Sequence, residues 1–225
     1  MPTLLESILN QKGVEISQVP IIVADNNSTD RTLEVVSEFQ SKGLSIQVVQ
    51  GGLPAKARNS GVKISETDYV IFLDADTTIA KDLIAVTLQQ ISINPKPCYA
   101  PFAHDKDRKF PFELMWIGYN FMIRTRLIGN ALGGFAVCFE REKFIEIGGF
   151  DETLNTHEDI EIGRRLSRSE VGILNTIVYM NPRRFERDGF WSVFWMYTRV
   201  FSISLFTKKY NHKSNSNYFN NDFRD

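Results

Sequence analysis

The sequence is poor in several features that would define a class of protein at once. Its 225 residues include only two cysteines, Cys98 and Cys138, and neither lies in a CxxC pair. This excludes a disulfide framework and favours a reducing, cytoplasmic setting. A net charge of −1 gives no bias toward nucleic acid or acidic partners. There is no internal repeat, and "MPTLLESILNQKG" lacks the basic and apolar regions of a signal peptide.

What the chain does have is enough apolar sequence for a full core, since 43% of its residues are hydrophobic. The apolar patterns predict strands over 19–25, 44–50 and 69–76, and helices over 1–13, 28–43 and 80–92, with a glycine-bearing loop that leads into a helix over 51–65. This alternation predicts an α/β domain with a largely parallel sheet, whose ligands gather beyond the carboxyl ends of the strands.

The second half of the chain is less regular. Residues 96–132 are rich in aromatics and carry the charged run "HDKDRK", so we expect irregular structure with an exposed loop. Residues 133–168 predict a strand, a short helix, a loop and a second helix. The Asn-rich end, 214–225, is expected to be disordered.

Two carboxylates follow the predicted strand "YVIFL", at Asp74 and Asp76. If the strand continues, both side chains point the same way and can hold Mg²⁺ or Mn²⁺ while leaving positions for water and phosphate. The alternative is that Asp76 caps the next turn and Asp74 is solvated. A D-x-D pattern alone does not decide between them.

Polar residues also follow the earlier predicted strands. Asp25 and Asn26 can hold a nucleobase or ribose beside a helix N-terminus, although "DNNSTD" equally suits an Asx-turn and a helix cap. Lys56 and Arg58 offer cations for a diphosphate, and a solvated helix start explains them as well.

A further acidic pair, Glu158 and Asp159, begins a predicted helix. Asp159 can act as a general base that takes a proton from an attacking hydroxyl, with Glu158 and His157 orienting it. Thr156 and Asp159 also have the spacing of a capping box, and the two interpretations are compatible.

The C-terminal part is basic and aromatic. Arg183 and Arg184 can bind phosphate as guanidinium forks, or can lie in a surface turn. Residues 189–206 are apolar but too short and too polar for a membrane span. A helix packed on the domain and a helix at an anionic lipid surface both stay open.

Taken in order, "VADNNSTDRT", "GGLPAKARNSGV", "FLDAD" and "GGFDETLNTHEDIEIGRRL" resemble the family-2 glycosyltransferases of GT-A fold, over roughly residues 4–190. The resemblance implies an inverting transfer of sugar from a UDP- or GDP-sugar to a glycan or lipid-linked hydroxyl. It implies that Asp25 and Asn26 contact the nucleotide, that Arg58 lies near it, that Asp74 and Asp76 meet ribose, metal and diphosphate, and that Asp159 is the base. "PRRF" is similar to a stretch found in members that act on lipid-linked or polymeric acceptors.

The family normally begins with a central strand, whereas this sequence begins with what looks like the helix after it. We therefore expect a GT-A domain over 1–188 without that strand, an aromatic and basic helical segment over 189–213, and a tail over 214–225. The expected location is cytoplasmic and peripheral at the inner face of the membrane. A truncated or inactive relative and a nucleotidyltransferase are the alternatives, although the glycine-rich triphosphate loop of the latter is not visible.

Overall fold

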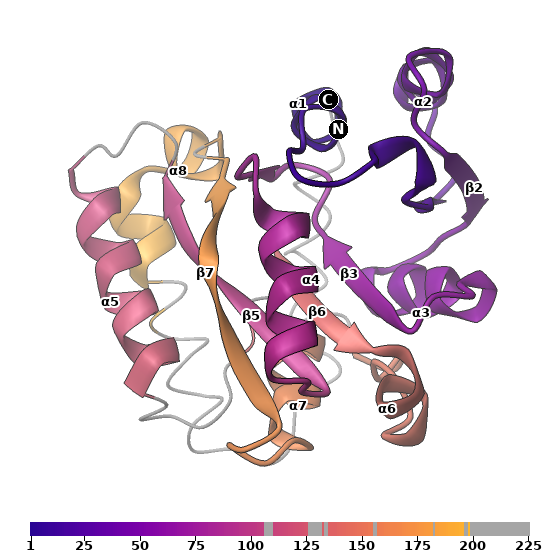
Figure 1. The fold of residues 1–225 in the computed structure, drawn as a ribbon. Coiled ribbons are helices and arrows are strands. Elements are labelled where there is room, and N and C mark those ends of the chain that lie inside the picture. The colour runs from indigo at the N-terminus through magenta and orange to yellow at the C-terminus, as the bar shows by residue number, and fades with distance from the viewer. Residues whose placement is uncertain are drawn as a thin grey trace.

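The computed structural model describes residues 1–105, 110–125, 132, 135–154, 157–181, 183–195 and 198. The predicted α/β architecture is confirmed in this part of the chain (Figure 1). The helices are α1 (Pro2–Leu9), α2 (Thr32–Ser41), α3 (Pro54–Ile64), α4 (Leu83–Ile93), α5 (Phe112–Thr125), α6 (Arg141–Glu146), α7 (Glu158–Arg164) and α8 (Arg183–Asp188), with a 3-10 turn, η1, at Ile16–Gln18. The strands are β1 (Ile21–Asp25), β2 (Ile46–Gln50), β3 (Tyr69–Leu73), β4 (Thr78–Ile79), β5 (Cys98–Asp105), β6 (Ala136–Glu140) and β7 (Val171–Met180).

The strands form two sheets. β1 and β2 make a parallel pair, and the other five strands follow the order β3-β6-β5-β7-β4. The expectation of a largely parallel sheet is wrong for this larger sheet. β6 lies between β3 and β5 and runs antiparallel to both, and β4 is antiparallel to β7, so only β5 and β7 pair in parallel.

The region expected to be irregular is largely regular. It contains β5, which lies at the centre of the larger sheet, and α5, which packs beside it. The Asn120 amide of α5 accepts a hydrogen bond from the Ala103 N–H at 2.9 Å and donates one to the Ala103 carbonyl at 2.7 Å, which fixes the helix to the strand. α2 also begins later than expected, at Thr32, since residues 26–31 form the preceding turn.

The N-terminal helix joins the two sheets. Leu4, Leu5 and Ile8 of α1 lie in one core cluster with residues of β1, β2 and α4. Gln11 follows α1 and donates to the Ala80 carbonyl at 2.7 Å, which ties the helix to the segment before α4. Because α1 contacts both sheets, it holds β1 and β3 on the same body of the protein.

Both cysteines are free and buried within the described structure. Burial raises the pKa of the Cys98 thiol well above its usual value and that of Cys138 to about 12. These thiols are therefore protonated core side chains near neutral pH.

Candidate active site

Arg58 is the centre of a charged cluster built from three distant segments. Its guanidinium donates to Asp74, just after β3, at 2.7 Å and also to Glu158 at the start of α7. The Arg58 side chain is only 13% exposed and lies over the Phe150 ring at 5.3 Å. A cation this well buried needs such partners, so the cluster fixes the relative positions of α3, β3 and α7.

The Asp74 carboxylate is incompletely compensated. Withdrawal from water is the main cause that raises its pKa, Asp76 and Glu158 raise it further, and Arg58 opposes them. One arginine thus faces more negative charge than it neutralises. A cation or a hydrogen-bond donor of a ligand would stabilise the ionised carboxylate here.

The strand does not continue through the two aspartates, as the simplest sequence argument assumed. β3 ends at Leu73, and the Thr77 N–H donates to the Asp74 carbonyl in a turn at 3.1 Å. Asp74 pairs with Arg58, so the interpretation of it as merely solvated is wrong. One large cavity lies beside the charged cluster, and both Asp74 and the exposed Asp76 line it.

Asp25 and Asn26 lie at the carboxyl end of β1, as expected, and both line this cavity. The Asp25 carboxylate accepts a hydrogen bond from the Ser28 N–H at 3.1 Å, three residues on rather than the two of an Asx-turn, so it holds the turn that follows β1. Asn26 is exposed. A turn of this kind still leaves oxygen lone pairs on Asp25 for a ligand.

Asp159 lies in the first turn of α7 and also lines the cavity. One of its oxygens accepts the Ile160 N–H at 2.8 Å. His157 precedes the helix with a φ of 68°, a strained conformation for a residue other than glycine. The expected capping by Thr156 lies outside the described residues.

Tyr119 of α5 was not anticipated from the sequence. Its hydroxyl is buried without a hydrogen-bond partner in the described structure, and it lines the same cavity. Burial raises the pKa of Tyr119 well above its usual value, and the nearby Asp159 carboxylate contributes. The Tyr119 O–H is therefore available to donate a hydrogen bond to a ligand beside Asp159.

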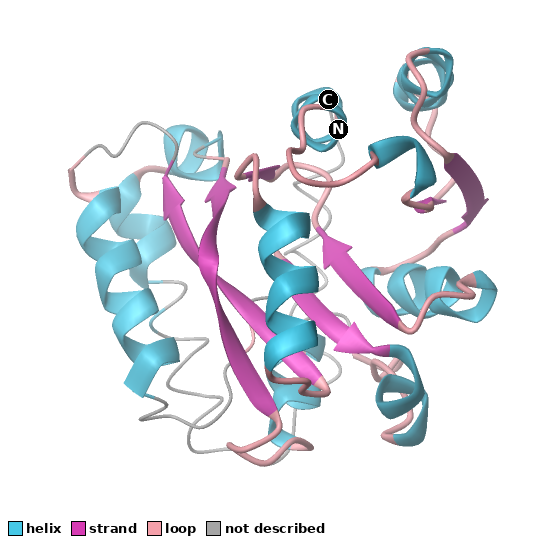
Figure 2. Cartoon of the chain, viewed as in Figure 1, coloured by secondary structure: helices cyan, strands magenta, loops and turns pink. Residues whose placement is uncertain are grey.

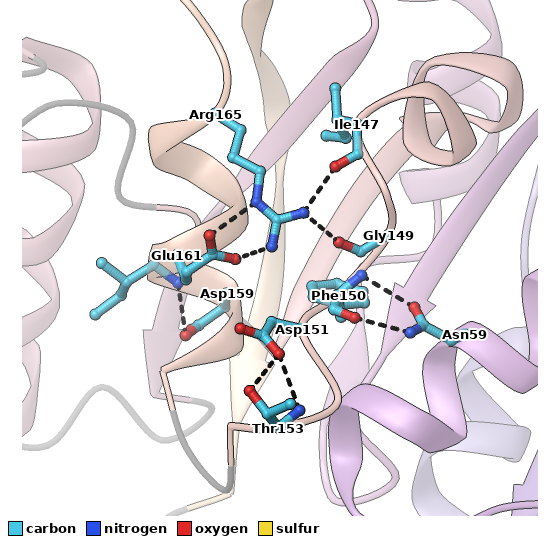
Figure 3. A network of polar contacts seen from close by, with 10 residues as sticks. Asn59, Ile147, Gly149, Phe150, Asp151, Thr153, Asp159, Glu161 and Arg165 are labelled. Atoms are coloured by element: carbon cyan, nitrogen blue, oxygen red, sulfur yellow. Dashed lines mark hydrogen bonds and ion pairs between the residues drawn. The ribbon is translucent and has the colours of Figure 1, made fainter. Parts of the chain in front are cut away.

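Residues 147–150 form the loop that carries Phe150 beneath Arg58, and this loop is held from two sides (Figure 3). The Asn59 amide donates to the Phe150 carbonyl at 2.8 Å and accepts the Phe150 N–H at 3.0 Å. Arg165, just after α7, donates to the carbonyls of Ile147 and Gly149 at 2.8 and 2.7 Å and pairs with Glu161. These contacts position the Phe150 ring under Arg58.

One expected residue is not brought to the cluster, and the side chains of two others lie outside the described structure. Lys56 is exposed on α3 and does not line the cavity, because two helical positions from Arg58 place it on another face. Arg183 and Arg184 lie on α8 rather than in a turn, and their side chains fall outside the described set. The cavity has a volume of about 2890 Å³ and brings together Asp25, Asn26, Arg58, Asp74, Asp76, Glu158 and Asp159.

The sequence pattern of Glycosyl transferase family 2 matches residues 1–145, and the chain belongs to this family. A poly-beta-1,6-N-acetyl-D-glucosamine synthase of Staphylococcus epidermidis is 31% identical over 178 residues, which cover 73% of this chain and 42% of that protein. An uncharacterized glycosyltransferase of Haemophilus influenzae is 29% identical over 72% of this chain and 55% of its own length. The chain thus spans about half the length of the curated relatives it matches.

Solved structures share the fold. TarS 1-349 of S. aureus in complex with UDP-GlcNAc superposes with a TM-score of 0.64 at 19% identity, over 93% of this chain and 63% of that one. A mannosyltransferase of Pyrobaculum calidifontis in complex with GDP-Man and Mn2+ gives 0.59 at 18% identity, over 77% and 51% of the two chains. The expected GT-A architecture is confirmed by these neighbours.

Proposed function

We propose that the protein transfers a sugar from a nucleoside-diphosphate donor, a UDP- or GDP-sugar, to a hydroxyl acceptor, with inversion at the anomeric carbon. The observation that carries this proposal is the convergence of Asp74, Glu158 and Arg58 in one cavity with Asp159. Relatives named for UDP-GlcNAc and GDP-Man complexes support the donor class.

For the donor, Asp25 and Asn26 would hold the base and ribose at the end of β1. Two guanidinium nitrogens of Arg58 are engaged by carboxylates, so we assign it a positioning role rather than direct binding of the diphosphate. Lys56 has no part in this proposal.

The residues present fit a divalent cation. The negative charge of Asp74 exceeds what Arg58 neutralises, and Asp76 is exposed beside it. Among the described residues no group of three or more metal-binding side chains occurs, so the protein would supply only these two carboxylates. One or two carboxylates completed by phosphate oxygens and water is the usual environment of Mg²⁺, and Mn²⁺ accepts the same oxygen ligands. Bound there, the ion would neutralise the charge that develops on the departing diphosphate.

Asp159 would take the proton of the acceptor hydroxyl. Its position in the cavity beside Glu158, which Arg58 holds, supports this role. The Tyr119 hydroxyl would donate to a sugar or acceptor oxygen next to it. Attack on the face opposite the leaving nucleotide gives inversion in a single displacement.

The acceptor is proposed to be a glycan or lipid-linked hydroxyl reached at a membrane surface. Among the residues that the structure describes, no helix is long and apolar enough to span a bilayer. Exposed apolar side chains gather on α5 and the helical residues 190–195, and the Phe112 and Phe190 rings join the two at 5.5 Å. These side chains are Leu114, Ile117 and Phe121 on α5 and Trp191 and Trp195, with Phe110 just before α5. Aromatics of this kind suit the lipid interface.

A donor screen tests the proposal. The protein is incubated with UDP-GlcNAc or GDP-mannose, with Mn²⁺ or EDTA, and the released nucleotide is measured. We expect metal-dependent release, lost in Asp159→Asn and kept in Glu142→Gln, which alters an exposed acid on α6. If the protein neither released nucleotide nor bound UDP, it would instead be a non-catalytic relative. Release of pyrophosphate from a nucleoside triphosphate would indicate a nucleotidyltransferase.

A further inference from the structure

Most of β5 has a strand on one side only. β7 pairs with it from Cys98 to Asp105, whereas β6 pairs with it at Cys98 and Tyr99. Beyond Tyr99, the edge of β5 that faces away from β7 has no strand beside it in the part of the chain that the structure describes. α5 lies beside the carboxyl end of β5 instead (Figure 2).

The Asn120 side chain of α5 takes the place of a strand at Ala103. Its Oδ1 accepts the Ala103 N–H at 2.9 Å, and its Nδ2 donates to the Ala103 carbonyl at 2.7 Å. Ala103 is 0% exposed, so without Asn120 both backbone groups would be buried polar groups that lack these bonds. Two hydrogen bonds to one residue also fix the position of α5 along β5, because each requires a narrow range of distance and angle.

A second polar contact between α5 and β5 is weaker. Glu113 lies about two helical turns before Asn120, on the same side of α5, and its Oε1 is 3.6 Å from His104 Nδ1. This distance is too long for a hydrogen bond. His104 Nδ1 and Glu113 Oε2 are buried without a hydrogen-bond partner among the described residues. The position of α5 on β5 therefore depends mainly on Asn120.

The residue next to Asn120 lines the active-site cavity. Successive side chains of a helix point about 100° apart, so Asn120 contacts β5 while Tyr119 lines the cavity. Burial, and then the nearby Asp159 carboxylate, raise the pKa of Tyr119 well above its usual value. The Tyr119 hydroxyl therefore keeps its proton near neutral pH and acts there as a hydrogen-bond donor.

The contacts that the structure describes for the Tyr119 ring are apolar. Its centroid lies 5.7 Å from that of Trp116 and 5.5 Å from that of Phe135, and the Trp116 and Phe135 rings are 6.1 Å apart. Such contacts are non-directional and tolerate small shifts. A hydroxyl displaced by about 1 Å, by contrast, loses its hydrogen bond to a reacting group. The place of the Tyr119 hydroxyl thus depends on where Asn120 sets α5.

We propose that Asn120 is a positioning residue for sugar transfer and that it acts through Tyr119. By holding α5 on Ala103, it keeps the Tyr119 hydroxyl where that group donates a hydrogen bond to the attacking oxygen of the acceptor. This oxygen forms its bond to the anomeric carbon as the bond from that carbon to the diphosphate breaks, and its proton passes to Asp159. The catalytic part of this role rests on the proposed function, whereas the placement of Tyr119 does not.

The test is a double-mutant cycle on nucleotide release from UDP-GlcNAc with Mn²⁺, in which water is the acceptor. Asn120→Ala and Tyr119→Phe should each lower kcat by about tenfold, and the double variant should be no more than about twofold slower than either. Thr125→Ala is the matched control and should keep kcat. Thr125 is exposed on the same helix, and its hydroxyl donates to the Phe121 carbonyl of α5 itself at 2.8 Å.

Calorimetry with UDP separates positioning from a general loss of structure. The Kd for UDP should change by less than about twofold in these variants, because Tyr119 contacts the acceptor rather than the nucleotide. Asn120→Gln keeps both polar groups and should recover most of kcat, and it replaces Asn120→Ala in the cycle if that variant does not fold. Full additivity of the two substitutions would overturn the proposal, as would an equal loss of kcat and UDP affinity in a folded variant.

Fluorine NMR tests the placement of Tyr119 without any activity. In the chain labelled with 3-fluorotyrosine, the Tyr119 signal is assigned by its loss in Tyr119→Phe. Asn120→Ala should shift or broaden this signal, and Thr125→Ala should not. An unmoved Tyr119 signal in Asn120→Ala would overturn the proposal. A wild-type chain that releases no nucleotide would overturn the proposed function and the catalytic role with it, while a moved signal would still confirm that Asn120 places Tyr119.

Discussion

Arg58 on α3 and Glu158 in the first turn of α7 form an ion pair across 100 positions of the chain. Their side chains are only 13% and 9% exposed. A buried pair of this kind is costly to break, because either charge left alone lies in a poorly solvated site. Since Asp159 follows Glu158 directly, the pair also determines where the proposed base lies.

We expect Arg58→Ala to destabilise the protein by about 3–5 kcal/mol, because it leaves Glu158 and Asp74 without their cation. Lys63→Ala is the matched control, since Lys63 is exposed on the same helix and does not line the cavity. It should cost less than about 1 kcal/mol. Denaturant unfolding measures both. Equal losses in the two variants would remove the pair from its structural role.

Replacement of Asp159 should affect chemistry rather than donor binding. Asp159→Asn keeps the shape of the side chain but removes the base, so turnover should fall by roughly 10²–10⁴-fold. Calorimetric binding of UDP should be unchanged. The contrasting variant is Glu142→Gln, which should preserve both. Full turnover in Asp159→Asn would assign the proton to another group.

The raised pKa of Asp74 predicts a pH dependence of metal and nucleotide binding. Only the ionised carboxylate binds a cation. The affinity for UDP with Mn²⁺ should therefore decrease as the pH is lowered through a midpoint above the ordinary Asp pKa of 3.8. Arg58 lowers this pKa, and Arg58→Gln should therefore move the midpoint to higher pH, whereas Arg58→Lys should move it less. Calorimetry across about pH 4 to 8 measures it. A midpoint indifferent to both substitutions would contradict the coupling.

Although Asp74 pairs with Arg58, its effect on stability has the opposite sign to that of an acid whose pKa a salt bridge lowers, because withdrawal from water outweighs Arg58. Because the folded pKa of Asp74 is above its unfolded value, ionised Asp74 destabilises the fold at neutral pH. That penalty is relieved as the pH falls through the folded pKa. Asp74→Asn should therefore reduce the pH dependence of unfolding in this acid range.

Two glycines provide a matched test of the loop under Arg58. Gly149 has a φ of +65°, and a Cβ there would lie 2.9 Å from Asn59 Oδ1, so Gly149→Ala should cost about 1–3 kcal/mol. Gly118 lies inside α5, where a Cβ meets nothing within 4 Å. Gly118→Ala should stabilise by about 0.5–1 kcal/mol. Thermal unfolding that shows the same sign for both would contradict this description of the loop.

The sequence was sufficient to predict the first half of the fold. The runs that became β1, β2 and β3 are rich in β-branched residues, and the helices between them have apolar faces. β5 was missed because Pro101 and the polar His104 obscure it. α5 was missed because apolar residues such as Ile117 and Phe121 lie on its exposed side, which hides the helical period.

The candidate site was predicted as a set of positions but not as a set of contacts. Asp25, Asp74 and Asp159 follow or begin regular elements, which sequence patterns reveal. The pairing of Arg58 with Glu158 depends on tertiary packing across 100 positions and leaves no local signal. Tyr119 lay in a region expected to be irregular, and the role of Asn59 depends on its tertiary contact with Phe150, which the sequence of a helix does not reveal.

The most direct test of the account is a crystal of this chain soaked with UDP and MnCl₂, with anomalous scattering recorded for manganese. We predict an anomalous peak between Asp74 and the Asp76 carboxylate, with the UDP diphosphate on the ion and the base beside Asp25. Manganese or UDP bound elsewhere, with these carboxylates uncontacted, would contradict the proposed donor site.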